Sequence, residues 1–173
     1  MTQVTNANNS AETLPILQEI HRTFGMVPNL FRSYANHPGL LEANWNKVKA
    51  VLLSGSIDRK TKELMAYLIS LDNGCSYCVA AHSAALLGFG IDKSQIDALL
   101  LGFYPSDMKA SDVALIKFSR KVNQHWREIT EEDLTALSRL EIDESKIIET
   151  IGIVELFGGF NRYARVMKVE VDF

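Results

Sequence analysis

The 173-residue sequence predicts an all-α fold, a bundle of about eight helices. Apolar residues recur at spacings of three and four along most of the chain, the pattern of helices that bury one face. Runs of alternating valine and isoleucine, which would indicate β-strands, are missing. Gly, Pro, Ser and Asp fall between the periodic segments, where helices begin and end. These three observations favour a helical domain over a mixed or β fold.

Prolines and glycines bound the first three expected helices. The first covers about residues 15–24 and ends before Gly25, and a short helix follows Pro28. Pro38 begins a longer helix that stops at the Ser-Gly-Ser stretch 54–56. Its apolar residues stand four, three and four apart, as one buried helix face requires: Leu41, Trp45, Val48 and Leu52.

Short polar side chains begin the later helices, because they accept hydrogen bonds from the free N–H groups of a first helical turn. The candidate caps are Asp58, Asp92, Thr130 and Asp143. The expected helices cover about residues 58–72, 75–87, 92–101, 110–126 and 130–140, and a very apolar last helix begins at 143.

Length and composition fit one globular domain. We expect a single domain over residues 12–173, preceded by a flexible segment at 1–11 that is polar and rich in Asn and Thr. That segment does not have the pattern of a secretory signal, and no apolar run is long enough to cross a bilayer, so the expected compartment is the cytoplasm. The net charge of −3 is too small to indicate a nucleic-acid or membrane partner.

Both cysteines of the chain lie three residues apart, at Cys75 and Cys78, and His82 follows four residues later. Two randomly placed cysteines would show this spacing about one time in a hundred. On a helix, the spacing puts the three side chains on one face, with the sulfurs close enough to bridge. Because Asn73-Gly74 ends the preceding helix, the CxxC pair lies at the N-terminus of a core helix, where free N–H groups favour a thiolate. A histidine one turn further can accept the thiol proton, which is typical of a thiol redox site.

Glu63 is the carboxylate expected to orient His82. A tight turn at Asn73-Gly74 would make the two neighbouring helices antiparallel. The ten residues back to Glu63 correspond to about 15 Å of helix rise, and the nine residues forward to His82 correspond to about 14 Å. The two side chains should therefore lie side by side across the helix pair.

The spacing of these four residues resembles the signature of the AhpD-like alkylhydroperoxidases, within the carboxymuconolactone decarboxylase superfamily. Residues 59–90 are similar to the core of that family, including the Leu-Gly-Phe-Gly stretch close after the histidine. The rest of the chain, with Phe-Gly-Gly-Phe-Asn-Arg at 157–162, is similar to its smaller peroxidase-related members. The resemblance implies an all-α, oligomeric thiol peroxidase that reduces alkyl hydroperoxides or hydrogen peroxide with neither a cofactor nor a metal.

The resemblance also implies a role for each residue. Cys78 matches the peroxide-attacking cysteine and Cys75 the resolving one, while Glu63 and His82 match the relay that activates Cys78. Turnover would leave a Cys75–Cys78 disulfide, reduced by a dithiol donor such as a lipoyl-bearing or thioredoxin-like protein, and the family forms homo-oligomers (dimers, trimers and hexamers). Tyr77 stands where the best-studied pattern has a second histidine. Its hydroxyl can form a hydrogen bond in an auxiliary role but cannot act as a base at neutral pH, which implies weaker activity or another reductant.

Three other interpretations stay open on the residues alone. The disulfide could be a switch in a non-catalytic redox sensor. Cys75, Cys78, His82 and Glu63 could hold a structural zinc ion, although such sites more often combine two Cys pairs. The cysteines could also simply pack as small buried hydrophobes. The decarboxylase branch of the superfamily fits less well because it generally lacks the pair, and the sequence leaves Asn161-Arg162 undecided between the site and an interface.

Overall fold

The computed structural model describes residue 11 and residues 13–173, so the flexible segment predicted at 1–11 lies, apart from residue 11, outside the described residues. The described part is all-α, as predicted, and contains no β-strand. None of its helices has the length and apolar character that crossing a bilayer requires. The helices are α1 (Leu14–Phe24), α2 (Asn29–Tyr34), α3 (Pro38–Val48), a π-helix (Lys49–Leu53), α4 (Arg59–Asp72), α5 (Ser76–Gly88), α6 (Lys93–Leu100), α7 (Ala110–His125), a 3₁₀-helix (Trp126–Glu128), α8 (Glu131–Ser138) and α9 (Glu144–Met167).

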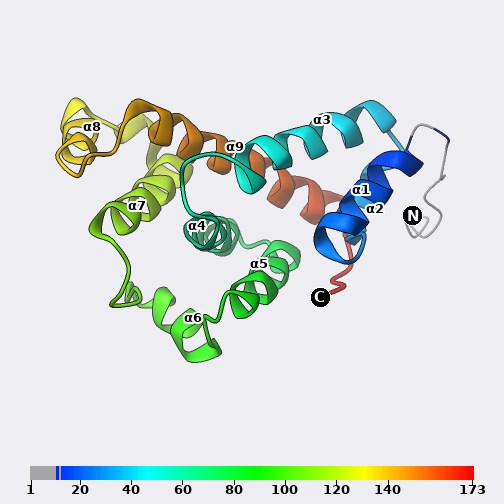
Figure 1. Ribbon diagram of the computed structural model, residues 1–173, viewed down its shortest axis with the longest axis horizontal. Helices are drawn as coiled ribbons and strands as arrows, with labels where there is room; N and C mark the ends of the chain where they lie inside the picture. Colours follow the sequence, from blue (N-terminus) through cyan, green and yellow to red (C-terminus); the bar gives the residue numbers. More distant parts are fainter. Residues whose placement is uncertain (1–10, 12) are drawn as a thin grey trace.

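Helix α4 is the centre of the bundle. Figure 1 looks along it, with α5, α7 and α9 packed around it. Residues 61–70 are all buried, which is typical of a helix enclosed by other elements on every side. Asp58 caps α4 as predicted, since its carboxylate accepts a hydrogen bond from the Lys60 N–H at 2.9 Å. Glu63 is therefore carried by the most enclosed helix of the fold.

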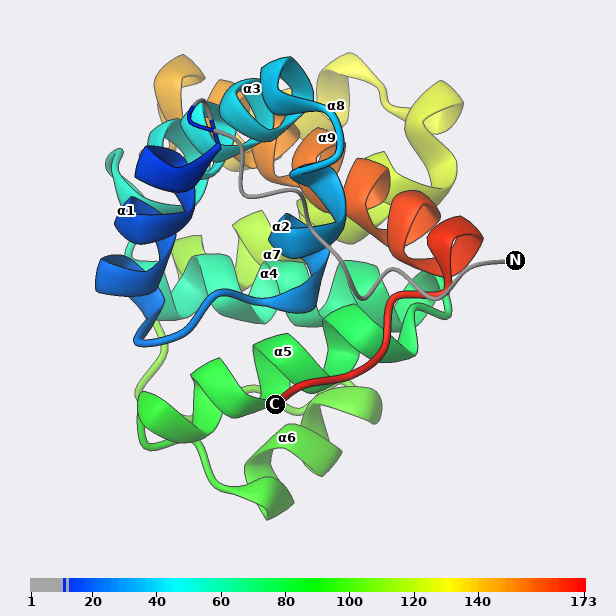
Figure 2. The same cartoon turned by 90° about the vertical axis from the view of Figure 1, so that its right-hand side faces the viewer.

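A tight turn reverses the chain between α4 and α5. Gly74 has φ +65°, in the left-handed region that a residue without a Cβ adopts readily. Its N–H donates to the Leu71 carbonyl at 3.0 Å. Helix α5 then packs back along α4, as Figure 2 shows from the side. The helix begins at Ser76 with Cys75 as its N-cap, one residue later than the sequence predicted.

A buried ion pair between Lys62 and Glu149 joins the first turn of α4 to α9. Lys62 also donates to the Ser54 carbonyl, and Glu149 accepts a hydrogen bond from the Ser56 N–H at 2.9 Å. Gly55, at φ +104°, passes so close to the Glu149 carboxylate that any Cβ would collide with it. These contacts fix the loop that leads into α4.

Two expected helices differ in detail from the prediction. The helix that begins at Pro38 changes into a π turn over Lys49–Leu53. Such turns are frequent at functional sites, and Leu52 of this turn lines the cavity described below. Helix α9 runs unbroken through Gly158-Gly159, where the sequence allowed either a bend or close packing; Gly158 is buried. The glycines therefore do not bend the helix.

Candidate active site

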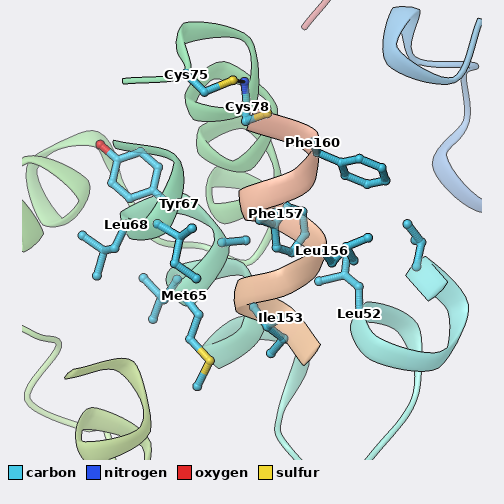
Figure 3. Close-up of a cluster of buried hydrophobic side chains, with 14 of the residues drawn as sticks. Leu52, Met65, Tyr67, Leu68, Cys75, Cys78, Ile153, Leu156, Phe157 and Phe160 are labelled. Carbon is cyan, nitrogen blue, oxygen red and sulfur yellow. Dashed lines mark hydrogen bonds between the residues drawn. The ribbon is translucent and has the colours of Figure 1, made fainter. Parts of the chain in front are cut away.

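The two cysteines meet at the start of α5. The Cys75 sulfur accepts a hydrogen bond from the Cys78 backbone N–H at 3.4 Å. Both are free thiols, and each residue is only 3% exposed. Figure 3 shows them in the same cluster of buried side chains as Phe157 and Phe160 of α9. The predicted closeness of the pair is confirmed, although Cys75 itself has an extended rather than helical backbone.

One of the two thiols ionises easily, and the other keeps its proton and stabilises the negative charge. The pKa of Cys75 is lowered from 9.0 to about 6, chiefly because the Cys78 thiol donates a hydrogen bond to its sulfur. The Cys78 N–H, the Asn161 amide and the charge of His82 act in the same direction, against burial. The pKa of Cys78 is raised, because its proton is held in the hydrogen bond to Cys75 and because it is buried. The hydrogen bond within the pair therefore favours a single thiolate, on Cys75.

Glu63 and His82 lie side by side, as the helix arithmetic predicted. The His82 Nδ1 and the Glu63 Oε2 are 2.6 Å apart. The other carboxylate oxygen, Oε1, accepts two hydrogen bonds from Arg59, at 2.8 Å from Nε and 2.6 Å from the terminal nitrogen. The sequence reasoning missed Arg59, although its spacing of four residues from Glu63 was a usable signal.

The environment of Glu63 keeps it ionised. Burial by itself raises the pKa of its carboxyl, but the hydrogen bond and charge of His82 and the Arg59 guanidinium outweigh burial, and the net pKa lies below the ordinary value of 4.5. An ionised carboxylate accepts the Nδ1 proton and fixes the ring. The other nitrogen of His82 is then the one that can exchange protons.

Asn161 of α9 lies beside the cysteine pair, and its side-chain amide helps to lower the pKa of Cys75. It is 3% exposed. Its amide nitrogen donates to the Ser70 hydroxyl at 3.0 Å, and its oxygen accepts from the Asn73 side chain at 2.8 Å. The sequence left this residue undecided, and the structure places it at the site. An asparagine on the apolar face that also carries Phe157 and Ala164 was the available signal.

An apolar cavity of about 380 Å³ opens onto Cys78 and His82. Most of its wall is made of apolar side chains from α1, α2, the π-helix and α9: Phe24, Leu30, Phe31, Leu52, Phe157 and Phe160. The His82 ring meets Phe157 edge-on, with ring centroids 4.5 Å apart. Cys75 is not among the described residues that line this cavity. A molecule in the cavity therefore meets the Cys78 sulfur.

Tyr77 turns away from the sulfurs and packs. Its hydroxyl accepts a hydrogen bond from the Leu30 N–H at 3.1 Å, and its ring meets Phe173 edge-on at 5.6 Å. Figure 2 shows the C-terminal tail crossing α5, where Asp172 accepts a hydrogen bond from the Asn29 N–H at 2.7 Å. Burial raises the pKa of Tyr77 well above its ordinary value of 10.0, so the phenol stays neutral. Tyr77 holds α2 and the tail at the edge of the cavity.

The four motif residues do not converge as a metal site. Both oxygens of Glu63 are engaged, one by Arg59 and one by His82. Within the described part of the chain, no three His, Cys, Asp or Glu side chains are arranged to hold a metal ion. The geometry therefore does not support the zinc interpretation.

Comparison with known proteins shows what the fold of this chain is similar to. Residues 38–110, which include all four motif residues, match the model of the carboxymuconolactone decarboxylase family. The crystal structure of an alkylhydroperoxidase AhpD core, a peroxidase-related protein from Ralstonia eutropha JMP134, is similar with a TM-score of 0.85. The match covers 99% of this chain and 91% of that chain at 24% identity. The chain has the AhpD-like fold.

Two further proteins are similar to this chain. The chain is 31% identical over 91 residues, or 53% of its length, to an alkyl hydroperoxide reductase of Mycobacterium tuberculosis, and it spans 26% of that relative's length. A variant of the debrominase Bmp8, in complex with 2,3,4-tribromopyrrole, shares the fold with a TM-score of 0.80 at 19% identity, covering 99% of this chain and 92% of that one. The solved structures show the fold, and the activity has to be inferred from the site.

Proposed function

We propose that the protein is a thiol peroxidase that reduces organic hydroperoxides. The observation that carries this proposal is the position of Cys78 in the wall of an apolar cavity, with Cys75 and the His82–Glu63 pair beside it. The apolar lining favours a hydroperoxide with an alkyl or aryl group over hydrogen peroxide. The distant relative named alkyl hydroperoxide reductase supports the same class of reaction.

Cys78 attacks the peroxide in the first step. Its proton passes to the Cys75 thiolate, to which it is hydrogen-bonded, and the Cys78 thiolate attacks the terminal oxygen of R–O–O–H. The O–O bond breaks, Cys78 becomes a sulfenic acid, and the leaving alkoxide takes a proton through His82 to become the alcohol. Glu63 keeps the imidazole oriented for this transfer.

Cys75 resolves the sulfenic acid in the second step. Once deprotonated again, its sulfur attacks Cys78, an S–S bond forms, and the S–O bond breaks to release hydroxide, which leaves as water with the Cys75 proton. The thiol pair has then supplied the two electrons that reduced the peroxide. An external thiol must return them before another cycle.

The test is a stoichiometric oxidation followed by turnover of two variants. One equivalent of cumene hydroperoxide should remove two hydrogen atoms from the peptide that contains Cys75 and Cys78, as measured by mass spectrometry. Cys78→Ser should abolish peroxide consumption, and Cys75→Ser should leave a Cys78 sulfenic acid that dimedone traps. Normal turnover by Cys78→Ser would refute the role of that cysteine. One oxidation without sustained consumption in dithiothreitol would identify a redox sensor instead.

The aromatic lining of the cavity also suits a halogenated ring, and this observation favours a second candidate function. The debrominase Bmp8, which has the same fold, binds 2,3,4-tribromopyrrole in its variant structure. Thiol-dependent debromination would replace one C–Br bond by C–H, release bromide, and oxidise the cysteine pair to the disulfide. Bromide release from tribromopyrrole, in equal amount to disulfide formed, supports this function, and a lack of bromide excludes it for that compound.

A further inference from the structure

A polar cleft of about 180 Å³, separate from the apolar cavity, also reaches the cysteine pair. The start of α5 supplies one wall, with Cys75 and Ser76, and the end of α9 supplies the other, with Arg165 and Lys168. Tyr77 lines both the cleft and the cavity and so stands between them. Each opening is lined by a different cysteine, because Cys78 lines only the cavity and Cys75 only the cleft among the described residues.

The charge of the cleft is positive. Arg165 and Lys168 are both exposed, and neither forms an ion pair with any other described residue. No acidic side chain of the described part of the chain lines the cleft. Arg165 and Lys168 therefore line the cleft together with Cys75, and no described residue neutralises their charge. This positive charge favours the binding of an anionic molecule.

To reduce a disulfide, a thiolate must reach one of the two sulfurs from the side that faces away from its bonded partner. A thiolate displaces the leaving sulfur along the line of the S–S bond. When Cys78 is the leaving group, the attacking thiolate must approach Cys75 from the side away from Cys78, and the cleft opens to Cys75. An attack there makes Cys78, the cysteine that lines the substrate cavity, the leaving group.

We propose that this cleft is the entry site of the reductant, a small thiol that bears a carboxylate, with Arg165 and Lys168 binding the carboxylate. The proposal rests on the thiol peroxidase function and adds the class of the electron donor to it. The thiolate RS⁻ attacks Cys75, forming Cys75–S–S–R and releasing the Cys78 thiolate. A second thiolate then attacks the R sulfur, releasing RSSR and the Cys75 thiolate. Two electrons pass from the two small thiols to the protein disulfide.

The burial of Cys75 favours a small reductant over a cysteine on a protein surface. With the residue only 3% exposed, an attacking sulfur has to enter the cleft to reach it. A compact thiol can do so while its carboxylate stays at the rim beside the two cations.

The test compares three small thiols that differ in charge: 3-mercaptopropionate, 2-mercaptoethanol and cysteamine. Protein oxidised to the disulfide with diamide is mixed with each thiol, quenched with iodoacetamide, and analysed by mass spectrometry. Second-order rate constants are expressed per thiolate and divided by the rate constant of the same thiol with a small uncharged disulfide, so that differences in acidity and in intrinsic nucleophilicity cancel. The anionic thiol should react about three- to tenfold faster than the neutral one at low salt, and cysteamine should be the slowest. The preference should fade in about 0.5 M salt, where charges are screened over a few ångströms.

The double variant Arg165→Gln/Lys168→Gln should lose the preference for the anionic thiol. Its rate with the neutral thiol, 2-mercaptoethanol, should stay unchanged, which shows that the site is still properly folded. Arg162→Gln is a control to compare with the single variant Arg165→Gln, since each removes one positive charge from an exposed position of α9 and only Arg165 lines the cleft. Equal rates for the three thiols with the unmodified protein, or a preference that survives in the double variant, would overturn the proposal. The disulfide is made with diamide, so a failure of peroxide to oxidise the pair would count against the peroxidase function and not against this site.

Discussion

The sharing of one proton by the two thiols can be tested by removing the Cys78 sulfur. The drop in the pKa of Cys75 from 9.0 to about 6 corresponds to about 4 kcal/mol in favour of its thiolate. The hydrogen bond from the Cys78 thiol is its largest cause, and a hydrogen bond to a charged group is worth about 1.5–3 kcal/mol. Cys78→Ala should therefore raise the pKa of Cys75 by about one to two units. The backbone N–H of residue 78 and the charge of His82 remain, so the pKa should stay below 9.0.

The assay is the rate of iodoacetamide alkylation of Cys75 between pH 4.5 and 9.5, followed on its peptide by mass spectrometry. The wild-type rate should rise with a midpoint near pH 6, because only the thiolate reacts. In Cys78→Ala, the rate at pH 7 should fall about two- to tenfold, as the thiolate fraction falls with the higher pKa. Cys78→Ser is the control, since its hydroxyl still donates a hydrogen bond and should give an intermediate midpoint. An unchanged midpoint in Cys78→Ala, or a wild-type midpoint near 9, would contradict this account of the pair.

Two further substitutions separate catalysis from packing. Glu63→Gln should lower kcat at least about tenfold, because the imidazole of His82 loses its ionised partner. It should also cost about 2 kcal/mol of unfolding free energy, less than a fully buried pair would lose, because the Arg59 side chain is 31% exposed. The pKa of the Glu63 carboxyl lies below 4.5 in the folded protein, so this stabilisation is complete above pH 4.5 and is lost on acidification. The difference in unfolding free energy between the variant and the wild type, measured with urea, should therefore shrink below about pH 4. A difference that does not depend on pH would contradict this. Tyr77→Phe should cost about 1–3 kcal/mol, because the Leu30 N–H loses its acceptor, while kcat changes less than about twofold. A large loss of kcat at unchanged stability would instead place Tyr77 in the chemistry.

Local spacing predicted a large part of this site. The distances along two helices that meet at a Gly74 turn were enough to place Glu63 beside His82, where the structure shows a 2.6 Å contact. The spacing of the cysteines was enough to bring their sulfurs together. Both relations depend only on helix rise and on one tight turn, which are properties of neighbouring residues.

Contacts between distant segments were harder to predict. Asn161 is far along the chain from Ser70, and only the packing of α9 against α4 brings their side chains together. The cavity and the cleft are spaces left between helices from both halves of the chain, so no single segment encodes either. The π turn at Lys49–Leu53 follows from how one helix fits its neighbours, which a periodic pattern does not show.

The sequence by itself determined that this chain is all-α and that a thiol pair, an imidazole and a carboxylate share one helix hairpin. Those features come from short-range backbone geometry, which residue spacing records directly. Only the tertiary structure decided which cysteine lines an apolar cavity and which lines a positively charged cleft. That difference arises because α9 and the C-terminal tail close over the hairpin, and their docking depends on side-chain packing over the whole molecule.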